Sequence, residues 1–125
     1  TDYLDGRWRG TLRDLEVCGQ LAAPAAVKEI TIGFLSHHRS GIIFPESIQL
    51  YTGSDMEHLS LTAKIAVPCE PCPREIYIQD FSLPVHKTIG AFRLVAHRYA
   101  KMPGWCCYRG STGVFTMSDN IIVSL

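Results

Sequence analysis

The sequence predicts an all-β domain, built as a sandwich or a barrel, and three observations lead to this prediction. Apolar and polar residues alternate over several short segments, as at Ile30, Ile32 and Phe34, and a period of two is that of a β-strand. No segment keeps apolar residues at spacings of three and four over two turns, so we expect almost no helix. Turns rich in glycine and proline separate the segments, which is typical of all-β folds.

Residues 27–35 form the expected central strand, on which the other strands register. Ile30, Ile32 and Phe34 give one apolar face, whereas the other face is mixed, because Val27 and Leu35 are apolar while Glu29 and Thr31 are polar. A strand that is apolar on one face and partly apolar on the other suits the inner part of a sheet in a two-sheet sandwich.

The other elements follow from the same alternation and from the residues that interrupt it. We expect residues 1–14 to form a loop and Gly19 to end a short first strand. The alanine-rich segment 21–26 is too short, and too interrupted by Pro24, to form a helix. Three prolines predict a stiff loop over residues 68–73, and residues 84–90 are expected to be a connection. The expected strands besides the central one are 15–18, 47–52, 59–67, 75–81, 91–99, 114–117 and 121–125.

Length and charge limit the classes of function. The 125 residues correspond to one domain, 1–125, with a hydrophobic share of 46%, which suffices for a core. Twelve basic residues balance twelve acidic ones, so nucleic acid, which favours a basic stripe, is not an expected partner. No apolar run reaches eighteen residues and no signal peptide opens the chain, so we expect no membrane span. The start without methionine leads us to expect a fragment of a longer protein.

The five cysteines are expected to be free thiols or to include one disulfide. Cys69 and Cys72 form one C-x-x-C pair, whereas Cys106 and Cys107 are adjacent. A four-thiolate zinc site would need a second C-x-x-C pair, so zinc is the less favoured alternative.

A catalytic centre is not expected. The five histidines form no H-x-x-x-H or H-E-x-x-H pattern, and no Gly-x-Ser-x-Gly elbow marks a nucleophile. The aspartates fall in turns or near strand ends, where solvated side chains are common. A stand-alone hydrolase, the alternative, would need His37 or His38 in a pocket within hydrogen-bond reach of an acid.

A sugar-binding surface suits the loop residues better. Sugars place their C–H face on an aromatic ring and accept hydrogen bonds from side chains such as arginine, and three loops offer both types of residue. If these loops lie at one end of the sandwich, they form one site; otherwise the tryptophans are packing residues and the histidines are solvated. The candidate ligand-binding residues are Arg7, Trp8, His37, His38, Arg39, Trp105, Tyr108 and Arg109.

Several motifs resemble those of discoidin-like domains, also called coagulation-factor type C or galactose-binding-like domains. Residues 15–27, LEVCGQLAAPAAV, resemble x-V-D-L-G-x-x-x-x-V-x-x-I, and residues 42–48, IIFPESI, resemble W-I-x-x-P-x-x-V. PGWC at 103–106 and FTMSDNI at 115–121 resemble P-x-W-H and F-x-D-E-I. With GRWRG at 6–10, these look most like the C-terminal domain of bacterial β-N-acetylhexosaminidases (chitobiases), especially those of Bacteroides-type bacteria.

This resemblance implies a jelly-roll β-sandwich of two antiparallel sheets, used as a non-catalytic accessory module of a larger glycoside hydrolase. The implied partners are a glycan of the N-acetylglucosamine or galactose type and the catalytic domain of the parent chain. A purely structural module, which packs on the catalytic domain without binding sugar, is the alternative. The implied location is periplasmic, outer-membrane-associated or secreted.

The resemblance also implies a structural calcium ion at the positions of Asp5 and Asn120. Here Asn120 stands where the family has glutamate, and its side chain offers one neutral oxygen where calcium prefers carboxylates. We therefore expect no cofactor, with calcium as the alternative. Ile42 and Cys106 replace a tryptophan and a histidine of the family, which weakens a sugar site at these two positions.

Overall fold

The computed structural model describes residues 9–11, 13–37, 40–68, 76–103, 114 and 116–125. These residues form β-strands and no α-helix, which confirms the all-β prediction. The strands pair antiparallel in the order β1-β6-β2-β5-β3-β4. Their bounds are β1 Arg9–Thr11, β2 Leu15–Ser36, β3 Ser47–Gly53, β4 Leu59–Ala66, β5 Tyr77–His97 and β6 Thr116–Ser124.

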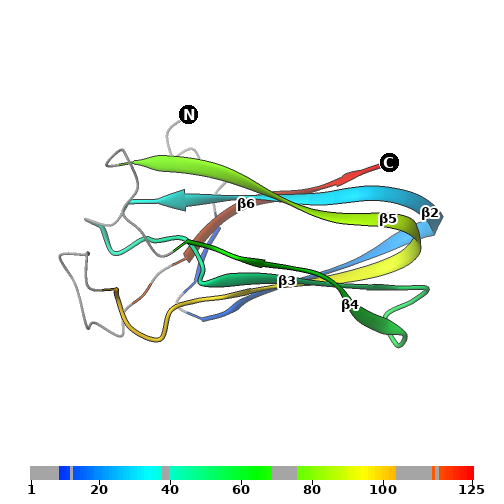
Figure 1. The fold of residues 1–125 in the computed structure, drawn as a ribbon, viewed down its shortest axis with the longest axis horizontal. Coiled ribbons are helices and arrows are strands. Elements are labelled where there is room, and N and C mark those ends of the chain that lie inside the picture. The colour runs from blue at the N-terminus through cyan, green and yellow to red at the C-terminus, as the bar shows by residue number, and fades with distance from the viewer. Residues whose placement is uncertain (1–8, 12, 38–39, 69–75, 104–113, 115) are drawn as a thin grey trace.

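Two long strands, β2 and β5, take part in both layers of a sandwich. Residues 15–20 of β2 pair with residues 91–96 of β5, which in turn pair with β3, and β3 pairs with β4. Residues 29–36 of β2 pair with residues 77–84 of β5 and also with β6. Both long strands turn back at one end of the molecule, so their halves lie in facing layers (Figure 1). The predicted sandwich of two antiparallel sheets is confirmed.

The strand ends expected near Pro24 and over residues 84–90 were wrong, because both segments bend a strand instead of ending it. The β2–β5 ladder shifts register between Gln20 and Ala25 and again between Val27 and Glu29. Pro24 lies within the first shift, where no ladder partner needs its missing N–H. His86, which has a φ of 51°, lies at the second. Pro24 and His86 thus lie at the β-bulges where β2 and β5 bend from one layer of the sandwich into the other.

Two further expectations need correction. The last two expected strands are one strand, β6, whose pairing with β2 shifts register between Ile32 and Phe34. The expected loop over residues 1–14 contains β1, which pairs with β6. Leu61 of β4 is 53% exposed, because the β3–β4 ladder shifts register and sets Leu61 opposite Tyr51.

The core lies between the two layers. Ile30, Ile32 and Phe34 of the predicted central strand are each at most 1% exposed, which confirms their assignment to the core face. Burying one such side chain stabilises the fold by about 1.5–3 kcal/mol. The buried cluster consists of Val27, Ile30, Ile32, Phe34, Ile48, Leu50, Val67, Phe81, Leu83, Val85, Ile89, Phe92, Leu94 and Ala96.

Candidate functional site

The predicted sugar-binding residues fall mostly outside the described part of the chain. His37 is described, and Asn120 is placed in β6 by its backbone alone. Their predicted convergence, and the calcium pair, therefore stay predictions. The predicted site residues outside the described ranges are Asp5, Arg7, Trp8, His38, Arg39, Trp105, Tyr108 and Arg109.

His37 directly follows β2 and is held in a tight turn. Its backbone N–H donates to the carbonyl of Ile42 at 2.8 Å, and its carbonyl accepts from the N–H groups of Ser40 and Ile42 at 2.9 and 3.2 Å. The imidazole Nδ1 lies 3.0 Å from Oγ of Ser40. The half-buried ring is thus fixed at the end of β2, which suits a residue that orients a ligand.

A small second core holds the chain at this end of the sandwich. Ile43, Met102 and Val114 are buried against one another, and Tyr99 packs on them. Ile43 belongs to the loop that begins with His37, whereas Met102 and Val114 lie on either side of residues 104–113. The described stems of two predicted site loops therefore share one apolar anchor, opposite the end at which β2 and β5 turn back (Figure 1).

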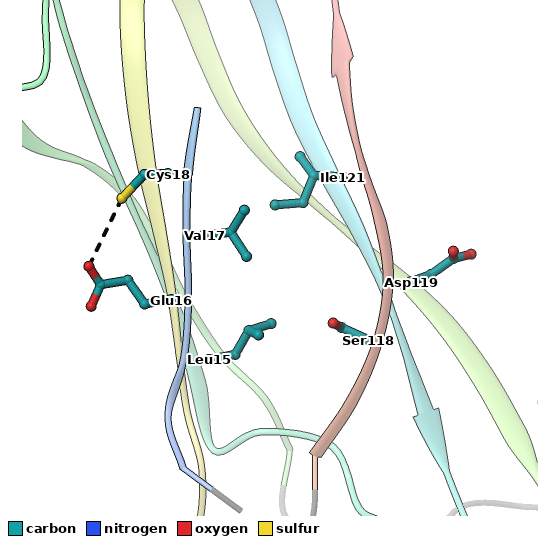
Figure 2. Close-up of a pocket in the computed structure, with 7 residues that line it drawn as sticks. All are labelled: Leu15, Glu16, Val17, Cys18, Ser118, Asp119 and Ile121. Carbon is teal, nitrogen blue, oxygen red and sulfur yellow. Dashed lines mark hydrogen bonds between the residues drawn. The ribbon is translucent and has the colours of Figure 1, made fainter. Parts of the chain in front are cut away.

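A groove of about 300 Å³ opens between β2 and β6. Figure 2 shows Leu15 and Val17 on one wall facing Ser118 and Ile121 on the other, while Glu16 and Cys18 point away from the groove. The opening exists because residues 15–20 of β2 pair with β5 alone among the described strands, whereas residues 29–35 also pair with β6. The described lining residues are Leu15, Glu16, Val17, Cys18, Ser118, Asp119 and Ile121.

Two buried hydroxyl groups lie on the inward face of β6. Thr116 is 1% and Ser118 is 3% exposed, and Oγ1 of Thr116 has no hydrogen-bond partner among the described residues. The Ser118 hydroxyl points into the groove (Figure 2). A buried hydroxyl without a partner costs about 1–3 kcal/mol, so such groups commonly serve a bound molecule or water. Ser118, in the segment T-M-S, was the sequence signal for this groove, and our reading of the sequence missed it.

A polar network covers the outer face of the layer formed by β3, β4 and the adjoining halves of β2 and β5. His97 lies between Asp14 and Gln49, with its ring nitrogens 3.0 Å from Asp14 Oδ2 and 3.0 Å from Gln49 Oε1. Arg93 pairs with Glu16 at 3.0 Å and lies over the ring of Tyr51 at 5.8 Å. Because the guanidinium covers the Tyr51 ring, this face ties three strands together and does not offer that ring for sugar stacking.

The pKa of Asp14 lies below its ordinary value. Partial burial alone would raise this pKa, but the backbone N–H of Arg98, which donates to Asp14 at 2.9 Å, and the His97 imidazole together outweigh burial. A lowered carboxyl pKa stabilises the fold above the unfolded-state value, and this contribution is lost as the pH falls through the folded-state pKa.

We expect Asp14→Asn to lower stability at pH 7 by no more than about 1 kcal/mol, since the side chain is 49% exposed and solvent screens it. The difference between variant and wild type should shrink as the pH falls below about 4. Urea unfolding at pH 7, 5 and 3 measures it. A difference that grows toward low pH would contradict the assignment.

The described residues bear on part of the metal and thiol predictions. Within the described ranges, no group of three or more histidine, cysteine, aspartate or glutamate side chains could hold a metal ion. Cys18 is an exposed free thiol that donates to Oε1 of Glu16 at 4.0 Å. The other four cysteines lie outside the described residues. The described chain also contains no helix that is long and apolar enough to cross a membrane.

A scan of the sequence against models of protein families finds no match, and a search of curated proteins finds none either. A search of solved structures does find similar folds. The selenomethionine-labelled CpGH89CBM32-4 of Clostridium perfringens, a carbohydrate-binding module, superposes with a TM-score of 0.55 at 12% identity, over 90% of this chain and 71% of that chain. The chain has the fold of a CBM32 β-sandwich.

The CBM32 fold is discoidin-like, so this likeness agrees with the fold that the sequence motifs imply. A structure of CpGH89CBM32-4 in complex with GlcNAc-alpha-1,4-galactose aligns with a TM-score of 0.45 at 10% identity, over 83% of this chain and 65% of that chain. That alignment is too weak to support an argument.

Proposed function

We propose that the chain is a non-catalytic carbohydrate-binding module of a larger glycoside hydrolase. The observation that carries this proposal is the β-sandwich fold shared with a CBM32 module. The described residues also favour binding over catalysis. Two histidines lie beside a carboxylate, in the pairs Asp14–His97 and Asp55–His58, and both pairs are on exposed surfaces. Neither pair lines the groove between β2 and β6.

The finer proposal names the parent enzyme and the ligand. Sequence motifs that resemble chitobiase C-terminal domains support a β-N-acetylhexosaminidase of Bacteroides type, exported from the cytoplasm, as the parent. The ligand is then a sugar of the N-acetylglucosamine or galactose type, stacked on Trp8, Trp105 or Tyr108. The apolar anchor formed by Ile43, Met102 and Val114, which holds the described residues on either side of 104–113, supports this proposal.

We expect N-acetylglucosamine or galactose to bind with measurable heat at millimolar concentration in calorimetric titration. Replacing Trp105 by alanine should weaken binding about tenfold, which corresponds to the 1.4 kcal/mol that a lost aromatic contact contributes. Ile122→Ala, an exposed change on β6, is the control and should leave affinity unchanged. The absence of heat and of thermal protection with both sugars would count against the proposal.

A second function, packing on a neighbouring domain without binding sugar, is supported by a different observation. Ile122 is 60% and Leu125 80% exposed, so the end of β6 presents apolar side chains that a catalytic domain could cover. In this case, deletion of the module would lower the thermal stability of the parent enzyme without changing its preference for polymeric substrate.

A further inference from the structure

We propose that the groove between β2 and β6 is a separate binding position that takes the acetamido group of an N-acetylated sugar. The proposal rests on the proposed glycan-binding function and adds to it the substituent that one position would recognise. The groove lies on the flank of the sandwich, between the β2 and β6 edges, rather than at the second core formed by Ile43, Met102 and Val114.

The walls of the groove suit a methyl group. Leu15 and Val17 face Ile121 across the opening (Figure 2), and all three are only partly buried, so a ligand can reach them. The described lining residues include no aromatic ring, so stacking of a sugar face is not what these walls offer. A volume of about 300 Å³ is at the lower limit of small-molecule sites, which fits one ring or one substituent rather than a polysaccharide chain.

The Ser118 hydroxyl of β6 suits an amide. Ser118 is almost fully buried, points into the groove and has no hydrogen bond to another described side chain (Figure 2). A hydroxyl can donate to the acetamido carbonyl or accept from its N–H. Thr116, two residues earlier on the same strand face, carries a buried hydroxyl without a partner among the described residues, but it is not one of the residues that line the groove. A methyl group bonded to an amide is the sugar substituent that uses the apolar walls and the hydroxyl together.

The charges around the groove favour a neutral ligand. The Glu16 carboxylate points away from the opening (Figure 2) and is paired with Arg93 at 3.0 Å. Asp119 also points away from the groove (Figure 2). The described lining residues contain no lysine, arginine or histidine, so a uronic acid or a sulfated sugar would find no counter-charge there. An N-acetylated neutral sugar meets no such penalty.

The test follows methyl resonances in proton–carbon NMR spectra of the whole chain, during titration with N-acetylglucosamine and, separately, with glucose. We expect the methyl signals of Leu15, Val17 and Ile121 to shift in a saturable way with N-acetylglucosamine and to stay unchanged with glucose. Val17→Phe, which fills the groove, should abolish the shifts. Ser118→Ala, which preserves the walls, should weaken binding at least fivefold. Ile122→Phe, on the outer face of β6, is the control and should leave binding unchanged.

The outcomes separate the two proposals. Shifts confined to Ile43, Met102 or Val114 would overturn the groove proposal and leave the glycan-binding function standing. Equal shifts at the groove with glucose would overturn the acetamido assignment. No shift with N-acetylglucosamine, glucose or galactose would overturn both proposals. Unchanged binding by a folded Ser118→Ala variant would also reject the role of the hydroxyl, whether or not Val17→Phe folds.

Discussion

We expect Phe34→Ala to lower the free energy of unfolding by about 3–5 kcal/mol. The ring is fully buried near the end of β2 and meets Phe81 edge to face, with 6.0 Å between ring centroids and 62° between ring planes. Phe81 in turn packs edge to face on Phe44, at 5.6 Å. Removing Phe34 therefore leaves a cavity between the two layers and removes one member of a row of three rings.

Denaturant unfolding, followed by fluorescence or circular dichroism, measures this loss. A domain of this size is stable by about 5–15 kcal/mol, so the variant should unfold at a clearly lower denaturant concentration. Ile122→Ala, also a change to alanine in the same layer but at an exposed position, should change stability by less than about 0.5 kcal/mol. A loss below about 1 kcal/mol for Phe34→Ala would contradict the placement of the core.

We expect Gly90→Ala to destabilise the fold by about 1–3 kcal/mol or more. Gly90 is buried in β5 next to the first register shift, and a Cβ there would overlap the backbone carbonyl of Ser54. A carbonyl in the turn after β3 cannot rotate away as a side chain can, so the backbone itself must move. The position therefore requires glycine because of close chain approach, with no need for a positive φ.

Gly33→Ala is the matched control for Gly90→Ala. Its added Cβ would lie 2.7 Å from Oδ1 of Asp80, the end of an exposed side chain that can swing aside. Thermal unfolding should show a drop of about 3–5 °C per kcal/mol for a domain of this length, and a larger drop for Gly90→Ala than for Gly33→Ala. The reverse order would mean that β5 does not pass the β3–β4 turn as described.

The strands could be predicted because side-chain alternation is a local property. Ile30, Ile32 and Phe34 are apolar at every second position, and the structure buries all three. The strand ends were less predictable. A proline such as Pro24 or Pro84 interrupts the hydrogen-bond ladder of a sheet only where a neighbouring strand needs the N–H that proline lacks. Pro24 lies in a register shift, and Pro84 pairs with Glu29 in a part of β5 that has one strand neighbour among the described residues.

The residue types of a sugar-binding site could be predicted from the sequence, but the position of the groove between β2 and β6 could not. The sequence offers aromatic, basic and histidine side chains in loops, and these composition signals led to the sugar-binding prediction. The groove escaped that reading because its walls are about one hundred residues apart in the chain. Val17 and Ser118 face each other because β2 runs through both layers. Residues 29–35 of β2 pair with β6, whereas Val17 lies in the other half of β2, in the facing layer.

The sequence by itself determined that this chain is an all-β domain with a core built on residues 27–35, because the apolar period of each segment depends on neighbouring residues alone. Only the tertiary structure decided that β2 and β5 each run through both layers, that bulges near Pro24 and His86 bend them, and that the Ser118 hydroxyl of β6 lines a groove. Those features depend on which strand lies beside which, and this choice balances burial across the whole core rather than within any one segment.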